Sequence, residues 1–248
     1  MKSLIETWKD CQKELEEINK ELETKPEGYL SKRRKFYYHT INGKEIGITK
    51  KPEIIRSLCR KAYLLARKEQ LIYNMILTPK ELKNFDERTP KELIAALSSA
   101  YQEVPISYFY HPSIEEWLAD SYKKHPYPPE EGQGYTTKNG VRVRSKSECF
   151  IATQLENYQI PYRYEAALKL KSKMEYPDFT IKNPITGKTI IWEHFGALHL
   201  SDYEKRMNEK MESYLMSGYI QNDTIIYTFE FQVENINRLQ KIIETLIP

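Results

Sequence analysis

The chain has 248 residues, a net charge of +3 and a hydrophobic content of 40%, and this length suffices for one large domain or two small ones. No apolar run approaches the ~20 residues that a membrane helix needs, and the N-terminus has no signal-peptide core, so we expect a cytoplasmic protein without a membrane partner. The three cysteines are too scattered for a metal motif or a disulfide framework.

Residues 3–24 carry apolar side chains at steps of three or four, which predicts an amphipathic helix. The simplest interpretation is a helix that packs on the rest of the chain. A homodimer formed through this helix is the alternative.

A basic segment follows over residues 29–50. Alternation at 36–40 and the turn pair Asn42–Gly43 predict two or three short antiparallel strands. Basic and aromatic residues interleave along them, which fits contacts with nucleic-acid phosphates; the alternative is a solvated sheet whose lysines protect its edges. The candidate nucleic-acid-binding residues are Lys32, Arg33, Arg34, Lys35, Lys44, Lys50 and Lys51.

The positive charge is concentrated early in the chain. Between Lys25 and Lys68 there are thirteen Lys or Arg residues and three acids, an excess of +10, which favours a polyanionic partner. A helix is predicted from Pro52 to about Leu77, and the sequence places five cations on its polar face: Arg56, Arg60, Lys61, Arg67 and Lys68.

The middle of the chain is richer in turns. Helices are predicted to start at Thr78–Pro79 and at Thr89–Pro90, the second covering 91–104, with a short helix at Ser113–Tyr122. Prolines and glycines then predict a linker at 126–140. We therefore expect a mostly helical region with the basic ribbon over 1–125, followed by a second domain over 141–248.

The second domain is predicted to be α/β. The pattern gives a helix from about Ser145, strands at Tyr162–Leu170, at 176–181 and at 189–196, a helix from Ser201, a strand at Asp223–Glu230 and a closing helix. The predicted order of elements is α-β-β-β-α-β-α.

Two acids stand out on the paired strands. The turn 183–188 would join the second and third strands as a hairpin and bring Asp178 beside Glu193. Glu193 lies in an otherwise apolar strand, where an acid must be paired, neutralised or bound to a cation. Two such carboxylates can hold Mg²⁺ or Mn²⁺, which prefer oxygen ligands.

The element order and these acids resemble the PD-(D/E)XK nuclease superfamily over about Val141–Pro248. Pro177–Asp178 match the Pro-Asp pair of the second core strand, Glu193 matches the acid of the third strand, and Glu148 matches the acid of the first helix. The resemblance implies a three-layer core around a central mixed sheet and metal ligation by Glu148, Asp178 and Glu193.

One position departs from the family pattern, because Phe195 stands where the motif has its lysine. Some members carry the lysine on the following helix, and Lys210 is the preferred replacement here, with Lys205 and Arg206 as alternatives. Lys210 and Tyr214 share a helical face and resemble a Gln-x-x-x-Tyr element with lysine for glutamine.

Two further residues are accessory candidates. Glu165 on the first strand is either a fourth site acid or the partner of Arg163 or another nearby cation. The imidazole of His194 would point to the sheet face opposite Glu193, so a supporting role is expected unless the strand bulges.

The sequence thus predicts a metal-dependent nuclease that acts on DNA, with RNA as the alternative substrate, in phage defence, mobile-element biology or repair. A nucleic-acid-binding protein with a decayed, inactive nuclease core is the alternative that Phe195 supports. Whether a homodimer or an activating protein partner is needed stays open.

Overall fold

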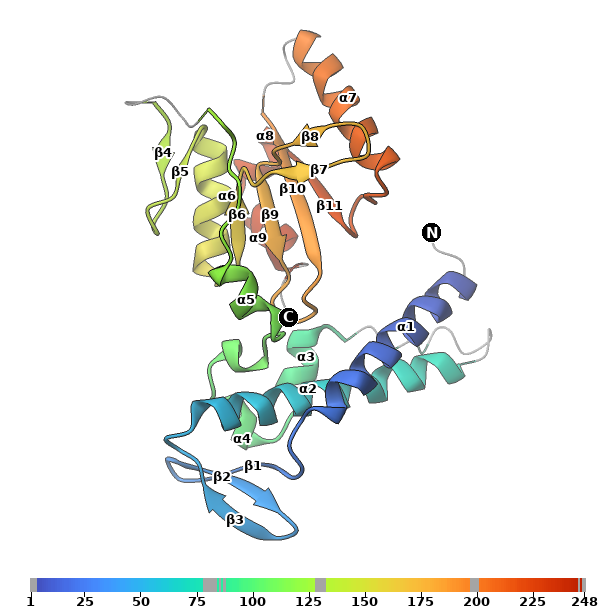
Figure 1. The fold of residues 1–248 in the computed structure, drawn as a ribbon, viewed down its shortest axis with the longest axis vertical. Helices are drawn as coiled ribbons and strands as arrows, with labels where there is room; N and C mark the ends of the chain where they lie inside the picture. The colour runs from blue at the N-terminus through green and yellow to red at the C-terminus, as the bar shows by residue number, and fades with distance from the viewer. Residues whose placement is uncertain are drawn as a thin grey trace. The chain divides into compact units, whose positions relative to one another are not determined.

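The computed structural model describes residues 4–77, 84, 86, 88–127, 133–196, 201–244 and 246, and its fold is shown in Figure 1. The chain divides into two compact units, Met1–Tyr110 with Pro248 and His111–Ile247. Both combine helices and strands, so the predicted mixed α/β class is confirmed. Among the described residues, no helix is both long and apolar enough to cross a membrane.

Two long helices form the frame of the first unit, α1 (Leu4–Glu23) and α2 (Pro52–Ile76), as predicted. Pro52 occupies the first turn of α2, where its missing N–H costs no hydrogen bond. Charged pairs join the helices, because Arg60 binds both carboxylate oxygens of Glu21 and Arg67 binds both of Glu14. These bidentate contacts fix the register of α1 on α2.

The predicted basic ribbon is a three-stranded antiparallel sheet of β1 (Tyr29–Arg33), β2 (Phe36–Ile41) and β3 (Lys44–Gly47), with β2 in the centre. Asn42 (φ 48°) and Gly43 (φ 76°) form the tight turn between β2 and β3. Left-handed backbone at both positions is what a two-residue hairpin turn requires, and Asn-Gly tolerates it best.

The predicted helix over 91–104 is wrong, since two short helices occur instead, α3 (Pro90–Ala95) and α4 (Ser99–Gln102). Thr89 and Glu92 form a capping box at the start of α3. Gln102 caps the C-terminal end of α3, because its side-chain amide donates to the carbonyls of Ile94, Ala95 and Leu97. A 3₁₀ turn follows at Ile106–Phe109. The predicted helix start at Thr78–Pro79 lies outside the described residues.

The boundary between the units falls after Tyr110, ahead of the position near residue 125 that the sequence suggested. Helix α5 (Ser113–Ala119) belongs to the second unit. The Arg163 guanidinium lies 4.2 Å from the Trp117 ring and donates to the carbonyls of Trp117 and Asp120. Cation–π and hydrogen-bond contacts of this kind attach α5 to the second unit.

The second unit is built on a four-stranded mixed sheet in the order β11-β10-β9-β6. Its strands are β6 (Tyr162–Tyr164), β9 (Phe179–Lys182), β10 (Thr189–Phe195) and β11 (Ile225–Phe229). β9 pairs antiparallel with β6 and β10, and β10 pairs parallel with β11. The parallel pair requires a crossover, which α7 (Ser201–Met216) provides.

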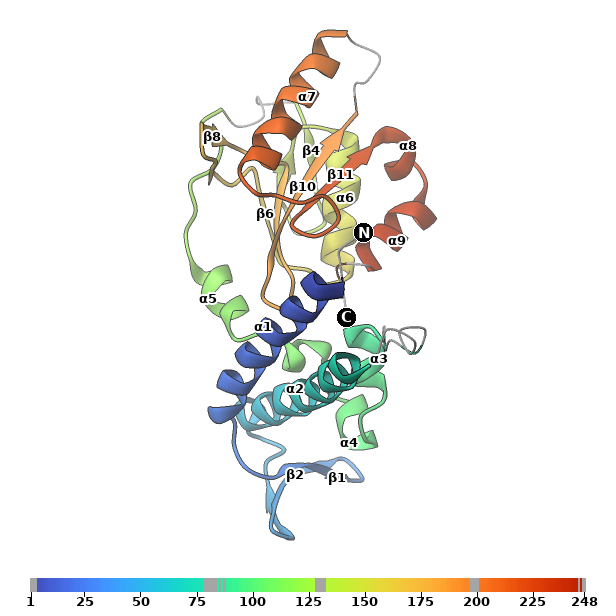
Figure 2. The same ribbon diagram turned by 90° about the vertical axis from the view of Figure 1, so that its right-hand side faces the viewer.

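Figure 2 shows the three layers that the sequence predicted, with α7 on one face of the sheet and α6 (Lys146–Asn157), α8 (Glu230–Val233) and α9 (Ile236–Glu244) on the other. Alternation along β10 assigns its residues to the two faces. Trp192 packs with α6 and α9 in the larger core cluster, whereas Ile191 packs against Tyr214 of α7. Both layers are therefore anchored by one strand.

The predicted strand Tyr162–Leu170 is interrupted and this prediction is wrong in its extent. Glu165 adopts left-handed backbone (φ 46°), which ends β6. The chain then forms a separate hairpin of β7 (Leu168–Lys169) and β8 (Met174–Glu175). A second small hairpin pairs β4 (Tyr135–Thr136), inside the segment predicted as a linker, with β5 (Arg142–Val143), which follows that segment.

Candidate active site

The β9–β10 register places the two predicted strand acids side by side. Trp192 pairs with Phe179 at the last assigned position of this ladder, and the next position along the same register sets Glu193 opposite Asp178. The backbone N–H of His194 donates to Asp178 Oδ2 at 2.7 Å. The hairpin that the sequence predicted therefore positions both carboxylates at one end of the strand pair.

Glu193 is almost completely buried, at 1% exposed, and both of its oxygens have partners. Lys210 Nζ donates to Oε2 at 2.7 Å, and Tyr214 Oη donates to Oε1 at 2.5 Å. Both donors come from α7, one helical turn apart, as their spacing predicted. The two alternatives to Lys210, which are Lys205 and Arg206, have exposed side chains.

The electrostatics of the pair follow from this burial. Burial raises the pKa of Glu193, and the charge of Lys210 opposes the rise. Burial and the charge of Glu193 hold the pKa of Asp178 well above its usual range. Burial alone would lower the pKa of Lys210, but the charges of Glu193 and Asp178 raise it above its ordinary value. The two neighbouring carboxylates thus keep the Lys210 side chain in its charged form.

Glu148 lies in the first turn of α6, and Ser145 caps this helix, because its Oγ accepts a hydrogen bond from the Glu148 backbone N–H. Its Oε2 accepts hydrogen bonds from Tyr164 Oη at 2.6 Å and from the Arg144 backbone at 3.0 Å. The charge of Glu148 contributes to the raised pKa of Asp178. Within the described ranges, no three His, Cys, Asp or Glu side chains are grouped closely enough to form a metal site.

An acid that the sequence analysis missed lies close enough to the pair to act on it electrostatically. Glu175 on β8 adds to the raised pKa of Glu193, and its carboxylate pairs with Lys173 at 2.5 Å. The signal was available, because Glu175 lies three residues before Asp178. The β7–β8 hairpin that brings Glu175 to the site could not be read from strand alternation, since each strand has two residues.

Phe195, at the motif-lysine position, is 4% exposed and lies on the same sheet face as Glu193. Its ring lies against Tyr227, Phe229 and Tyr203, with centroid distances of 5.8, 6.0 and 6.4 Å. It is therefore an aromatic packing residue, and the ammonium group at the acids comes from Lys210 instead.

His194 points to the opposite sheet face, as the regular strand predicted. Its Nε2 lies 3.0 Å from Glu230 Oε2, and its Nδ1 lies 3.2 Å from Thr228 Oγ1. Ser147 on α6 donates to the other Glu230 oxygen at 2.7 Å. A Cβ on Gly196 would stand 3.0 Å from Glu230 Oε2, so glycine leaves room for this network. The network ties the Glu148 helix to the strand that carries Glu193.

Glu165 is held by Arg144, whose Nε donates to Oε1 at 2.6 Å and whose second nitrogen donates to Oε2 at 3.1 Å. The sequence had left its partner open between the site and a nearby cation. The structure brings it to a cation, and Arg144 is that cation.

The ribbon cations differ in their surroundings. Lys32 pairs with Glu103, and Arg33 pairs with Glu45 at 2.9 Å. Within the part of the chain that the structure describes, the other five are exposed and have no ion pair, namely Arg34, Lys35, Lys44, Lys50 and Lys51.

The sequence counted the α2 cations toward a surface for a polyanion, but four of them have partners within the first unit. Arg60 and Arg67 pair with α1 acids, Lys61 Nζ donates to the carbonyls of Pro26 and Gly28, and Lys68 Nζ donates to Asn19. Much of the local excess of +10 thus stabilises the first unit.

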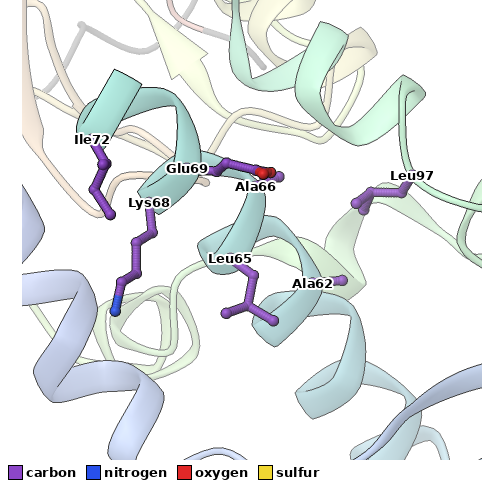
Figure 3. Close-up of a pocket in the computed structure, with 7 residues that line it drawn as sticks. All are labelled: Ala62, Leu65, Ala66, Lys68, Glu69, Ile72 and Leu97. Atoms are coloured by element: carbon purple, nitrogen blue, oxygen red, sulfur yellow. The ribbon is translucent and has the colours of Figure 1, made fainter. Parts of the chain in front are cut away.

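An open pocket of about 570 Å³ occurs elsewhere, on the first unit (Figure 3). It is lined by Ala62, Leu65, Ala66, Lys68, Glu69, Ile72 and Leu97. Apolar side chains dominate its lining, and Lys68 and Glu69 are its two charged residues.

The chain is similar to an uncharacterized protein of Methanocaldococcus jannaschii, MJ1519, at 29% identity over 156 residues. The match covers 62% of this chain but 12% of the length of that protein, so the chain spans a small part of this relative. No family model and no solved structure matches the chain. The functional argument therefore rests on the geometry of the site.

Proposed function

We propose that the chain is a divalent-cation-dependent nuclease of the PD-(D/E)XK type that hydrolyses phosphodiester bonds in DNA. The observation that carries the proposal is the contact of Lys210 with Glu193 beside Asp178. The site has two strand acids and a helix-borne lysine, so the function of the missing motif lysine is supplied from α7.

The two strand carboxylates are ligands of the type that a hard divalent cation prefers. Asp178 is half-buried, and among the described residues its side chain accepts one hydrogen bond, from the His194 N–H to Oδ2. Burial raises the pKa of both carboxyls, and the charge of Glu193 adds to the rise at Asp178, so a divalent cation bound beside them would favour their ionised forms. Asp178 and Glu193 would hold Mg²⁺ or Mn²⁺, and Glu148 would complete the ligand set directly or through water. The bound cation would neutralise the phosphate and activate water.

The chain's own groups have separable roles. Lys210 is a fixed ammonium that can orient the attacking water and stabilise charge developing on the phosphate oxygens. Tyr214, whose pKa is raised by burial and by the charge of Glu193, stays protonated and donates to Glu193. The His194 backbone N–H orients Asp178.

The first test compares the wild type with Asp178→Asn. Asparagine keeps an oxygen for the His194 N–H, and removal of a carboxylate whose pKa is raised should not lower the melting temperature. Cleavage should fall to the level of buffer. The assay uses linear, circular and single-stranded DNA and RNA with Mg²⁺ or Mn²⁺, and Glu204→Gln on the exposed side of α7 is the control.

Three outcomes separate the candidate functions. Loss of DNA cleavage in Asp178→Asn with full activity in Glu204→Gln supports the proposal. Cleavage of RNA alone assigns the same chemistry to an RNase. Equal behaviour of wild type and Asp178→Asn on every substrate rejects the enzyme and leaves the nucleic-acid-binding protein that Phe195 suggested.

The exposed ribbon cations are proposed to bind DNA phosphates. The triple variant Lys35→Gln, Lys44→Gln, Lys50→Gln should bind DNA more weakly. The slope of log affinity against log salt should become less negative by ~0.9 for each phosphate that the variant no longer neutralises. The matched control is the triple substitution Lys9→Gln, Lys13→Gln, Lys20→Gln on α1, which removes the same charge. Equal affinity and slope in both variants would exclude the ribbon.

A further inference from the structure

A row of aromatic rings leads from Phe195 to the surface. The Phe195 ring packs on Phe229, and Phe229 stacks on Phe231 with a centroid distance of 6.3 Å and an interplanar angle of 3°. Phe195 is buried at 4% exposed, whereas Phe231 is 58% exposed. The inner rings pack in the core, whereas the outermost ring presents a large apolar surface to solvent.

The inner end of this row adjoins the candidate active site. In the parallel ladder Glu193 pairs with Tyr227 and Phe195 pairs with Phe229, so all four residues occupy the same sheet face. Burial and the charge of Glu193 raise the pKa of Tyr227 to about 12. Helix α8, which carries Phe231, follows β11 without a gap (Figure 2). The row thus starts beside the acids and ends at an exposed ring.

A cation accompanies the exposed ring. The Arg238 guanidinium lies 5.8 Å from the Phe231 ring centroid, and its NH1 donates to the Phe231 carbonyl at 3.2 Å. The Arg238 side chain is exposed. The neighbouring acid Glu230 binds Ser147 and His194 through its two oxygens. An aromatic face with an adjacent guanidinium matches a nucleotide, because the base can stack on the ring while the phosphate meets the cation.

We infer that Phe231 is a stacking platform for an unpaired base of the strand whose backbone enters the Asp178–Glu193 site. The inference rests on the proposed nuclease function and names its substrate class, single-stranded or locally unpaired nucleic acid. A base inside a duplex has both faces covered by its neighbours, so only an unpaired or terminal base can lie on the ring.

The test measures binding in the Asp178→Asn background, so that cleavage does not interfere. Adding Phe231→Ala should weaken binding of a fluorescent single-stranded oligonucleotide by ~10-fold, because stacking on one aromatic ring contributes ~1–3 kcal/mol per base. Phe231→Trp should retain the affinity, and Phe231→Leu should lose it, since leucine is apolar but has no π face. Affinity for a blunt duplex of the same sequence should change less than twofold.

A direct readout is the fluorescence of 2-aminopurine placed along the single strand, which should change on binding to the Phe231 protein and not to the Phe231→Ala protein. Equal loss of affinity for single strand and duplex, or equal affinity of the alanine and phenylalanine proteins for single strand, would overturn the inference. A lower molecular mass of Phe231→Ala in solution with unchanged DNA binding would assign the ring to a second copy of the chain and also overturn it. These measurements do not depend on cleavage, so failure of the platform is distinct from failure of the nuclease proposal.

Discussion

Replacing Lys210 with alanine is expected to slow DNA cleavage by ~100-fold or more, the typical effect of removing one fixed charge stabiliser from an active site. The reason is that Lys210 Nζ lies 2.7 Å from Glu193 Oε2 and its charge also acts on Asp178. With Phe195 at the motif position, no other described lysine makes a contact with this pair. The measurement is the single-turnover rate at saturating Mn²⁺.

Lys205→Ala is the matched control, because the same helix carries this lysine with an exposed side chain. It should cleave at the wild-type rate, and Tyr214→Phe should keep part of the activity because Lys210 remains. Full activity in Lys210→Ala together with loss in Lys205→Ala would show that the wrong lysine was chosen.

The Lys210→Ala variant also has a stability signature that is independent of cleavage. Without the ammonium, the pKa of buried Glu193 should rise further, so the folded state retains a proton that the unfolded state has lost. The free energy of unfolding should therefore decrease relative to the wild type as the pH increases above the ordinary glutamate range. A constant difference across pH would contradict the proposed coupling.

The two strand acids and Lys210 could be found from the sequence because each lies in a strongly patterned segment. A short turn between two β-like runs fixes which residues face each other, and i,i+4 spacing fixes which share a helix face. Glu175 and the Arg144 partner of Glu165 were missed because irregular segments position them. Glu165 has left-handed backbone, which strand propensity does not predict.

The same distinction between patterned and irregular segments applies to the elements of the fold. The long helices and the ribbon follow local periodicity and were predicted. The helix over 91–104 was not, because Gln102 caps α3 through contacts that its composition does not reveal. The unit boundary lies earlier than the sequence suggested, because Arg163 attaches α5 to the second unit from more than forty residues away. Gln102 binds carbonyls five to eight residues earlier in the chain, and Arg163 binds carbonyls 43 and 46 residues earlier, so side-chain contacts decided both cases.

Charge counting along the sequence had the same limitation. Arg60 and Arg67 increased the apparent basic patch, but their partners Glu21 and Glu14 lie 39 and 53 residues earlier in the chain. A local window cannot include both members of such a pair. Of the cations counted in that window, five on the ribbon are exposed and have no ion pair in the described part of the chain: Arg34, Lys35, Lys44, Lys50 and Lys51. Replacing these should weaken nucleic-acid binding, whereas replacing the paired α2 cations should lower stability.

Glu21→Gln is therefore expected to destabilise the first unit without changing nucleic-acid affinity. Burial opposes ionisation of Glu21, but the hydrogen bonds and charge of Arg60, with those of Lys25, lower its pKa to about 2. Because this value lies below that of the unfolded chain, the stabilisation is complete above the ordinary glutamate pKa and is lost as the pH falls toward 2. A shift of this size corresponds to at most about 3 kcal/mol at neutral pH, and solvent screening reduces it.

The substitution also leaves the Arg60 guanidinium, whose side chain is 6% exposed, with an uncompensated charge. Urea denaturation of Glu21→Gln should show the full loss at pH 7 and a smaller loss at pH 3. Glu14→Gln is the control, because its pair with Arg67 is more exposed and should contribute less than ~1 kcal/mol. Equal losses at both pH values would contradict the lowered pKa. A cation used only in packing should not change DNA affinity while the protein stays folded. Weaker DNA binding by folded Arg60→Gln protein would therefore show that Arg60 contributes to binding.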